Sequence, residues 1–209
     1  MKIGILGTGD VGQALARKLA SLGHDVLMGA RSASNDKAAA FAREAGGSAG
    51  TFIDAMAHGE WIFVCIDGAY TIATLQSAGA GALDGKLIVD ISNLPLPDPS
   101  ETGSLGLSVQ RAFPKARVVK TLNCVSAELM TEPARLPGDH TVFVSGDDAA
   151  AKAEVTDMLA GFGWKSIVDL GGIESARAPE QFVTLWIAIN KALGITDFNF
   201  ALLRGGSRP

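Results

Sequence analysis

The stretch KIGILGTGDVG, residues 2–12, decides the fold class. Its first part, residues 2–7, is a short apolar run that ends in glycine, which is typical of a strand buried in a parallel sheet. Residues 11–22 then place apolar side chains on one face of a helix, which Gly23 stops. A strand, a glycine turn and a helix in this order predict the first unit of an α/β domain.

The same alternation continues to about residue 170. Runs rich in apolar and β-branched residues predict strands over residues 25–29, 48–52, 61–66, 86–91, 117–122, 141–145 and 166–170. Helical periodicity predicts helices over residues 38–45, 53–57, 70–78, 107–113 and 149–162. We therefore expect a Rossmann-like, doubly wound, mostly parallel sheet with helices on both faces, formed by residues 1–172.

Residues 173–209 are expected to form a short C-terminal helical appendix. Within it, residues 179–193 are apolar on nearly every side, with Trp186 near the centre. A helix that is apolar all round is normally buried, and little chain remains to cover it. We expect it either to cap the sheet or to form the contact of a homodimer, closing the acceptor pocket.

Composition excludes several classes of partner. The 209 residues carry 18 basic and 22 acidic side chains, a net charge of −4, so no basic surface for nucleic acid or acidic membrane is expected. No secretory signal or transmembrane span is predicted. Cys65 and Cys124 lie far apart and outside any CxxC pattern, which favours two reduced, buried thiols in a cytoplasmic protein.

The run Gly7-Thr8-Gly9-Asp10-Val11-Gly12 is a G-x-G-x-x-G between a predicted strand and a predicted helix. The first glycine allows the tight turn, the second lets backbone N–H groups approach a diphosphate, and the third allows close helix–strand packing. The helix N-terminus adds partial positive charge. A dinucleotide cofactor is therefore predicted, with Asp10 interpreted as the helix N-cap.

The choice between NAD and NADP is made at the end of the second predicted strand. NAD enzymes place a carboxylate there for the ribose hydroxyls. This chain has Arg31 and Ser32 instead, whereas Asp25 comes too early and Asp36 too late. An arginine can form a fork of hydrogen bonds with the 2′-phosphate, with the serine as a second donor. The pattern predicts NADP(H).

Several motifs together resemble deazaflavin (coenzyme F420)-dependent NADP oxidoreductases. They are the glycine loop, ARS at 30–32, DISN at 90–93, VVKTLN at 118–123, VSGDD at 144–148 and the closing apolar helix, so the resemblance covers the whole chain. It implies hydride transfer between NADPH and the deazaflavin, by homodimers. Related domains reduce flavins or ferric complexes.

The resemblance also implies roles for individual residues. Those expected to contact the diphosphate are Thr8, Gly9, Asp10 and Val11. Those expected to border the cofactor as the fourth strand ends are Cys65, Ile66 and Asp67. Ser92 and Asn93 would line the nicotinamide side, and Asn123 is the candidate for orienting the acceptor. One departure leaves the acceptor open: the family commonly has proline and an aromatic residue where this chain reads Asp67-Gly68-Ala69-Tyr70.

The residues offer no dedicated catalytic acid or base. Lys191 lies in the apolar helix without a partner motif, His24, His58 and His140 are expected in turns or at the surface, and no metal-ligand spacing is present. Hydride exchange between two planar cofactors needs only stacking and orientation. Three alternatives remain: a flavin or ferric reductase, an imine or ketone reductase with its pocket between subunits, and a non-catalytic NADPH sensor.

Overall fold

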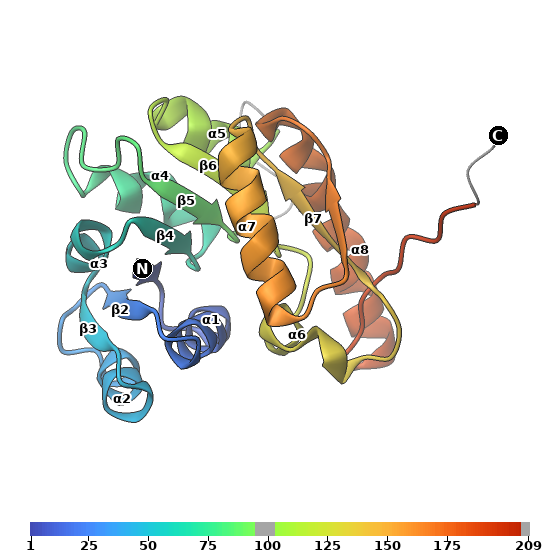
Figure 1. Cartoon of the computed structure of the whole chain (residues 1–209), viewed down its shortest axis with the longest axis horizontal. Coiled ribbons are helices and arrows are strands. Elements are labelled where there is room, and N and C mark those ends of the chain that lie inside the picture. The colour runs from blue at the N-terminus through green and yellow to red at the C-terminus, as the bar shows by residue number, and fades with distance from the viewer. Residues whose placement is uncertain (95–102, 206–209) are drawn as a thin grey trace.

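The computed structural model describes residues 1–94 and 103–205, which form an eight-stranded sheet with helices on both faces (Figure 1). The strand order is β3-β2-β1-β4-β5-β6-β7-β8. All neighbouring strands are parallel except β6 and β7. The strands are β1 (Lys2–Leu6), β2 (Asp25–Ala30), β3 (Ser48–Thr51), β4 (Trp61–Val64), β5 (Leu87–Asp90), β6 (Arg117–Thr121), β7 (Thr141–Ser145) and β8 (Ser166–Asp169). The first six follow the Rossmann order, which confirms the predicted fold class.

The helices connect these strands and lie close to their predicted positions. They are α1 (Asp10–Ser21), α2 (Asp36–Ala45), α3 (Phe52–His58), α4 (Gly68–Gln76), α5 (Leu105–Ala112), α6 (Ala127–Thr131), α7 (Ala149–Phe162) and α8 (Arg177–Leu193), with 3-10 turns at Pro133–Arg135 and Ile173–Ala176. Every predicted element is present to within two residues at each end. The short α6 and the two 3-10 turns were not predicted.

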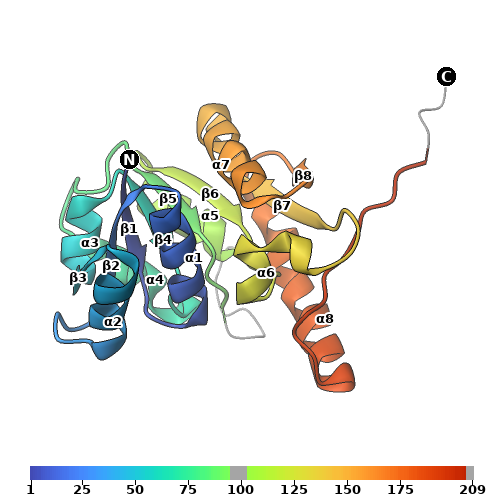
Figure 2. The same cartoon turned by 60° about the horizontal axis from the view of Figure 1, so that its bottom comes forward.

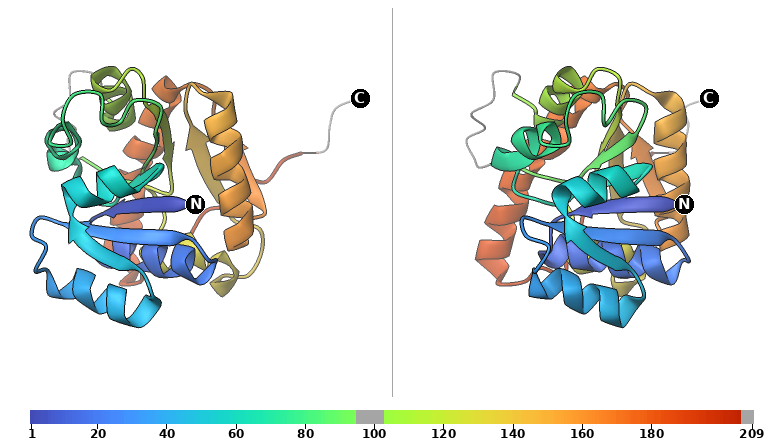
Figure 3. Two further views of the ribbon diagram at one scale, coloured as in Figure 1. Left: turned by 60° about the vertical axis from the view of Figure 1, so that its left-hand side comes forward. Right: turned by 90° about the vertical axis from the view of Figure 1, so that its left-hand side faces the viewer.

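Two apolar cores cover the two faces of the sheet. One contains side chains of α1, α2, α6 and α7, among them Leu15, Phe41 and Leu159. The other contains side chains of α3, α4 and α5, among them Met56 and Leu75. Figure 3 shows α1 and α2, in blue, across the sheet from α4 and α5, in green. The carboxyl ends of β1, β2, β4, β5 and β6 thereby share one edge, where ligands of such sheets bind.

Helix α8 is the largest departure from the sequence-based expectation. It packs against α5 and the Ile173–Ala176 turn and extends past the sheet (Figure 2). Only Pro179 of its residues is buried, and Leu185 and Leu193 are 46% and 63% exposed. In the single chain α8 is therefore not the buried cap on the sheet that was one of the two expectations. The other expectation, a homodimer contact, stays a prediction. No helix in residues 1–94 and 103–205 is long and apolar enough to cross a membrane.

The segment after α8 folds back onto the domain. The ring of Phe200 packs edge-on against Phe182, and the Thr141 N–H donates to the Phe200 carbonyl at 2.7 Å. Asn199 lies 2.8 Å from Nδ1 of His140, whose Nε2 lies 2.8 Å from the Pro133 carbonyl oxygen. His140 precedes β7 as predicted, but it is buried by this segment and is not a surface residue.

Candidate functional site

The glycine loop between β1 and α1 is shaped by close backbone approaches. Gly7 has φ +122°, and a Cβ there would lie 2.4 Å from the Cys65 carbonyl oxygen. A Cβ on Gly12 would lie 2.2 Å from the Gly7 carbonyl oxygen. By contrast, a Cβ on Gly9 would meet no atom of the described part of the chain within 4 Å. Packing thus requires glycine at two of the three positions, while Gly9 borders open space.

That open space adjoins the N-terminus of α1. Gly9 is the N-cap of this helix, and among residues 1–94 and 103–205 no side chain caps the free N–H groups of the first turn. Uncapped amides and the positive end of the helix dipole bind phosphate oxygens well. The loop therefore fits the diphosphate of a dinucleotide.

Asp10 does not have the predicted capping role. The N-cap is Gly9, with ψ −176°, and Asp10 is the first helical residue, exposed to solvent. The chain leaves its extended conformation one residue earlier than predicted. Asp10 still stabilises the positive end of the helix dipole, but it weakens the attraction of that end for an anion.

Arg31 and Ser32 follow β2 directly and are exposed. The Ser32 hydroxyl lies 2.8 Å from that of Ser34. The carboxylates closest in sequence do not lie at the end of the strand: Asp25 begins β2 and Asp36 lies in the first turn of α2. The end of β2 therefore has positive charge and hydroxyl donors, as the binding of a 2′-phosphate requires.

The segment after β4 leads into α4. Cys65 and Ile66 are half-buried, and the Asp67 carboxylate caps α4 by accepting from the Ala69 N–H at 2.9 Å. The Gly68 N–H donates to the Asn93 carbonyl at 3.0 Å, and a Cβ on Gly68 would lie 2.5 Å from that oxygen. Gly68 thus brings the start of α4 into direct contact with Asn93.

The polar residues after β5 and β6 are brought together as predicted. Asn93 Nδ2 donates to the Asn123 carbonyl at 2.8 Å, and Asn123 Nδ2 donates to Asn93 Oδ1 at 3.0 Å and to the Pro179 carbonyl at 3.0 Å. Ser92 is buried, and its hydroxyl donates to Asp90. Asn123 is also buried, whereas Asn93 is partly exposed. Asn93 is therefore the member of this group that solvent can reach.

Two features of this region were missed by the sequence reasoning. Leu122 has φ 60°, a left-handed conformation that is rare for a large side chain and occurs mainly where surrounding structure enforces it. Lys120 is buried within β6 and contacts Asp90 and Glu180. A single lysine within the apolar run RVVKTL was the one available signal.

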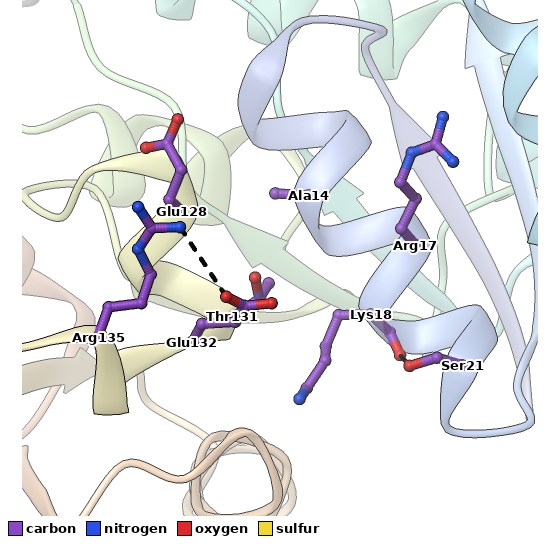
Figure 4. Close-up of a pocket in the computed structure, with 8 residues that line it drawn as sticks. All are labelled: Ala14, Arg17, Lys18, Ser21, Glu128, Thr131, Glu132 and Arg135. Carbon is purple, nitrogen blue, oxygen red and sulfur yellow. Dashed lines mark hydrogen bonds and ion pairs between the residues drawn. The ribbon is translucent and has the colours of Figure 1, made fainter.

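A separate surface hollow of about 410 Å³ lies between α1 and α6 (Figure 4). It is lined by Ala14, Arg17, Lys18, Ser21, Glu128, Thr131, Glu132 and Arg135. Arg135 lies 4.0 Å from Glu132, and Arg17 is paired with Glu44 outside the hollow. Its α1 residues lie after the glycine loop, from Ala14 to Ser21, and Arg135 also pairs with Asp197 outside the hollow. We assign it no part in cofactor binding.

The chain is similar to known NADP oxidoreductases. A family model described as NADP oxidoreductase, coenzyme F420-dependent, matches residues 2–94. The crystal structure of a protein from Arthrobacter sp. FB24, provisionally named an F420-dependent NADP reductase, is 43% identical, with a TM-score of 0.91 over 98% of this chain and 100% of that chain. The protein belongs to the coenzyme F420-dependent NADP oxidoreductase family.

Two further proteins are similar to this chain in sequence. The F420-dependent NADP reductase of Methanocaldococcus jannaschii is 28% identical over 91% of this chain and 92% of its own length. Rat metalloreductase STEAP3 is 32% identical over 86% of this chain, which spans only 36% of that protein. As a member of this family, the protein is an NADP-dependent oxidoreductase with NADP(H) as its cofactor and a small molecule as its redox partner.

Proposed function

We propose that the protein transfers a hydride between NADP(H) and a flavin-like acceptor, with a deazaflavin preferred over FMN. The observation that carries this proposal is the hydrogen-bonded pair Asn93–Asn123 at the carboxyl ends of β5 and β6. Neutral amides can orient a ring carbonyl and stabilise charge that gathers on it without titrating. The family names of the relatives favour the deazaflavin.

Each part of the site has a distinct task in this proposal. The uncapped N-terminus of α1 binds the diphosphate, and Arg31 with Ser32 holds the 2′-phosphate. Bound NADPH supplies the hydride from its nicotinamide ring. Asn93, which is partly exposed, orients the reacting rings. Asn123 holds Asn93 in place, because its own amide hydrogens go to Asn93 and Pro179.

We also propose that the protein is a homodimer, and the evidence for it lies in residues 173–209. Helix α8 exposes Leu185 and Leu193, and the indole Nε1 of Trp186 is buried without a partner in the described part of the chain. A second subunit on α8 would cover this apolar surface and adjoin the acceptor site. Light scattering of the purified protein should give the mass of a dimer, and a monomer at high concentration would refute it. A cytoplasmic site of action, where thiols such as Cys65 and Cys124 stay reduced, is part of the same proposal.

The reaction is tested by stopped-flow mixing with NADPH that carries deuterium stereospecifically at C4. Acceptors to compare are coenzyme F420, FMN, FAD, ferric chelates, and small ketones and imines. Label is followed in F420, ketones and imines, where deuterium is bound to carbon; with flavins, whose N5 deuterium exchanges with water, and with ferric chelates, which accept only electrons, the loss of NADPH absorbance is followed instead. Fastest NADPH oxidation with F420, with label in the product, supports the proposal. Oxidation by ketones or imines alone refutes the acceptor class, and oxidation by none of the acceptors leaves an NADPH sensor. The rate of hydride transfer should depend weakly on pH between about 6.5 and about 8.5, the ordinary pKa values of histidine and cysteine side chains, since the proposal uses no titrating acid or base.

Truncating the amide pair tests its role. Asn93→Ala should lower kcat by up to about 10²–10³-fold, the loss of a donor to the transition state. Asn123→Ala should also lower kcat, because Asn93 is no longer held in place. NADPH affinity should stay within a few-fold of wild type, because both residues lie beyond the diphosphate loop. Gln76→Ala, which truncates an exposed amide at the end of α4, is the matched control.

A further inference from the structure

A lysine with no solvent exposure lies beneath the candidate site. Lys120 of β6 has a side chain that is 0% exposed, although buried lysines are rare without partners. Its ammonium group donates to Asp90 Oδ2 at 2.9 Å and to the Ser92 carbonyl, and lies 3.2 Å from Glu180 Oε1. These acceptors match the three donors of an ammonium group.

Both carboxylates of this cluster have further partners. Asp90 Oδ1 accepts from the backbone N–H of Ser92 at 3.0 Å and from its hydroxyl. The Glu180 carboxylate accepts from the N–H groups of Leu105 and Gly106, at 3.0 and 2.9 Å, in the first turn of α5. One ammonium group and one helix N-terminus thus balance the buried carboxylate of Asp90 and the carboxylate of Glu180, which is 11% exposed. Removing either partner would leave an uncompensated buried charge.

The cluster connects the cofactor side of the molecule with the C-terminal helix. Pro179 and Glu180 lie in the first turn of α8. Glu180 contacts Lys120, and the Pro179 carbonyl accepts from Asn123. The end of β6 therefore holds α8 at two points, one on each side of Leu122. The same lysine fixes the carbonyl of Ser92, whose neighbour Asn93 pairs with Asn123.

We propose that Lys120 is a positioning residue that fixes Ser92 and Asn93 relative to the first turn of α8, so that cofactor binding and the position of α8 are coupled. The effect on turnover rests on the proposed function, but the coupling itself does not. If Lys120 were purely structural, its loss would lower the stability of the fold without a specific effect on how NADPH binding reaches α8. A positioning lysine makes one specific prediction: without it, NADPH still binds but its effect no longer reaches α8.

The test uses the full-length protein and NADPH as the only ligand, with amide hydrogen exchange read by mass spectrometry. In wild type, NADPH should slow exchange both in peptides of the glycine loop and in the peptide that contains the first turn of α8. In Lys120→Met, the glycine-loop peptides should still be protected and the α8 peptide should not. Lys115→Met makes the same substitution in an exposed ion pair with Asp84 and should behave as wild type.

A charge-neutral variant separates positioning from charge balance. Lys120→Met/Asp90→Asn/Glu180→Gln removes all three charges, so its melting temperature should recover toward wild type, because no buried charge is left unpaired. Its α8 peptide should remain unprotected by NADPH, and its kcat should stay about 10²-fold low, as expected for a misplacement near 1 Å. If Lys120→Met does not fold, this variant is compared directly with wild type.

The exchange and affinity measurements on wild type and the variants decide whether Lys120 couples NADPH binding to α8. Loss of NADPH-induced protection at α8 in the variants, with NADPH affinity within about threefold of wild type, supports the proposal. Protection of α8 that persists in either variant, or that returns with the melting temperature in the neutral variant, overturns it. If wild type transfers hydride to no acceptor, the proposed function fails while the exchange experiment still decides the coupling. Wild-type protein in which NADPH never protects α8 also overturns the proposal.

Discussion

The guanidinium group of Arg31 lies over the ring of Tyr70, with Cζ 6.0 Å from the ring centroid. The arginine follows β2 and the tyrosine lies in the first turn of α4, so the contact joins the loop after β2 to the start of α4 at the carboxyl edge of the sheet. Tyr70 is 61% exposed, so its ring is open to solvent beside the arginine. The ring restricts the arginine before any phosphate is bound.

Arg31→Ala should weaken NADPH binding and leave NADH binding nearly unchanged. A hydrogen bond to a charged group contributes about 1.5–3 kcal/mol, which corresponds to about 10- to 150-fold in affinity. Isothermal titration calorimetry with both cofactors measures this directly. Equal losses for NADPH and NADH would remove the 2′-phosphate assignment.

Tyr70→Leu should lower NADPH affinity by about two- to fivefold, the equivalent of an exposed cation–π contact of about 0.5–1 kcal/mol. Tyr70→Phe keeps the ring and should retain most of the affinity. In the Arg31→Ala background, Tyr70→Leu should have little further effect, since the residue acts through the arginine. Additive losses in the double variant would contradict this arrangement.

Two substitutions in the glycine loop should have different effects. Gly12→Ala should lower both the melting temperature and NADPH affinity, because its Cβ would lie 2.2 Å from a backbone oxygen. Gly9→Ala should leave the melting temperature within a few degrees of wild type, because its Cβ meets no atom of the described residues within 4 Å. It should still impair NADPH binding, since the methyl group would enter the space assigned to the diphosphate. Tight NADPH binding by Gly9→Ala would place the cofactor elsewhere.

Both thiols should be slow to alkylate in the folded protein. Burial, with the nearby Asp90 charge second, raises the pKa of Cys65, and burial raises the pKa of Cys124 to about 11. The reactive thiolate is therefore scarce at pH 8. Iodoacetamide labelling followed by mass spectrometry should show slow modification at pH 8 and rapid modification after unfolding. Fast labelling of native Cys65 at pH 8 would contradict this environment.

Asp148 should contribute to stability in a pH-dependent way. Its carboxylate caps α7 through the Ala151 N–H and pairs with Arg117, and these contacts lower its pKa. Because the folded-state pKa lies below the unfolded one, this stabilisation is present above the unfolded value and is lost as pH falls through the folded one. Asp148→Ala should cost about 1 kcal/mol at pH 7, a typical N-cap loss. Asp148→Asn should cost less and should remove this acid dependence in urea unfolding.

Most of the fold could be predicted from the sequence because its apolar runs and helical periodicity end where glycine or proline residues mark the ends of strands and helices. Apolar runs such as residues 61–66 and stops such as Gly23 mark buried strands and helix ends without reference to distant residues. The five-residue α6 is too short for a period to show. The reversed direction of β7 relative to β6 was also not predicted, since a strand's own sequence does not encode its direction.

The candidate site was predicted only in part, for a similar reason. The glycine loop and Arg31 are local patterns, so their roles could be assigned from spacing alone. The contact between Lys120 and Glu180 joins residues 60 positions apart, and no local pattern indicates it. The partners of Asn123 were likewise unforeseen, because Pro179 lies in a helix whose position depends on the completed sheet.

The folded-back segment after α8 has a consequence for protein engineering. Backbone and side-chain bonds from Asn199, Phe200 and Leu202 reach Thr141 at the start of β7. A shortened version that stops at Gly194 would release these bonds and uncover the aromatic rings on α8, so it should aggregate. A fusion partner or immobilisation tag attached beyond Gly205 leaves every one of these contacts in place.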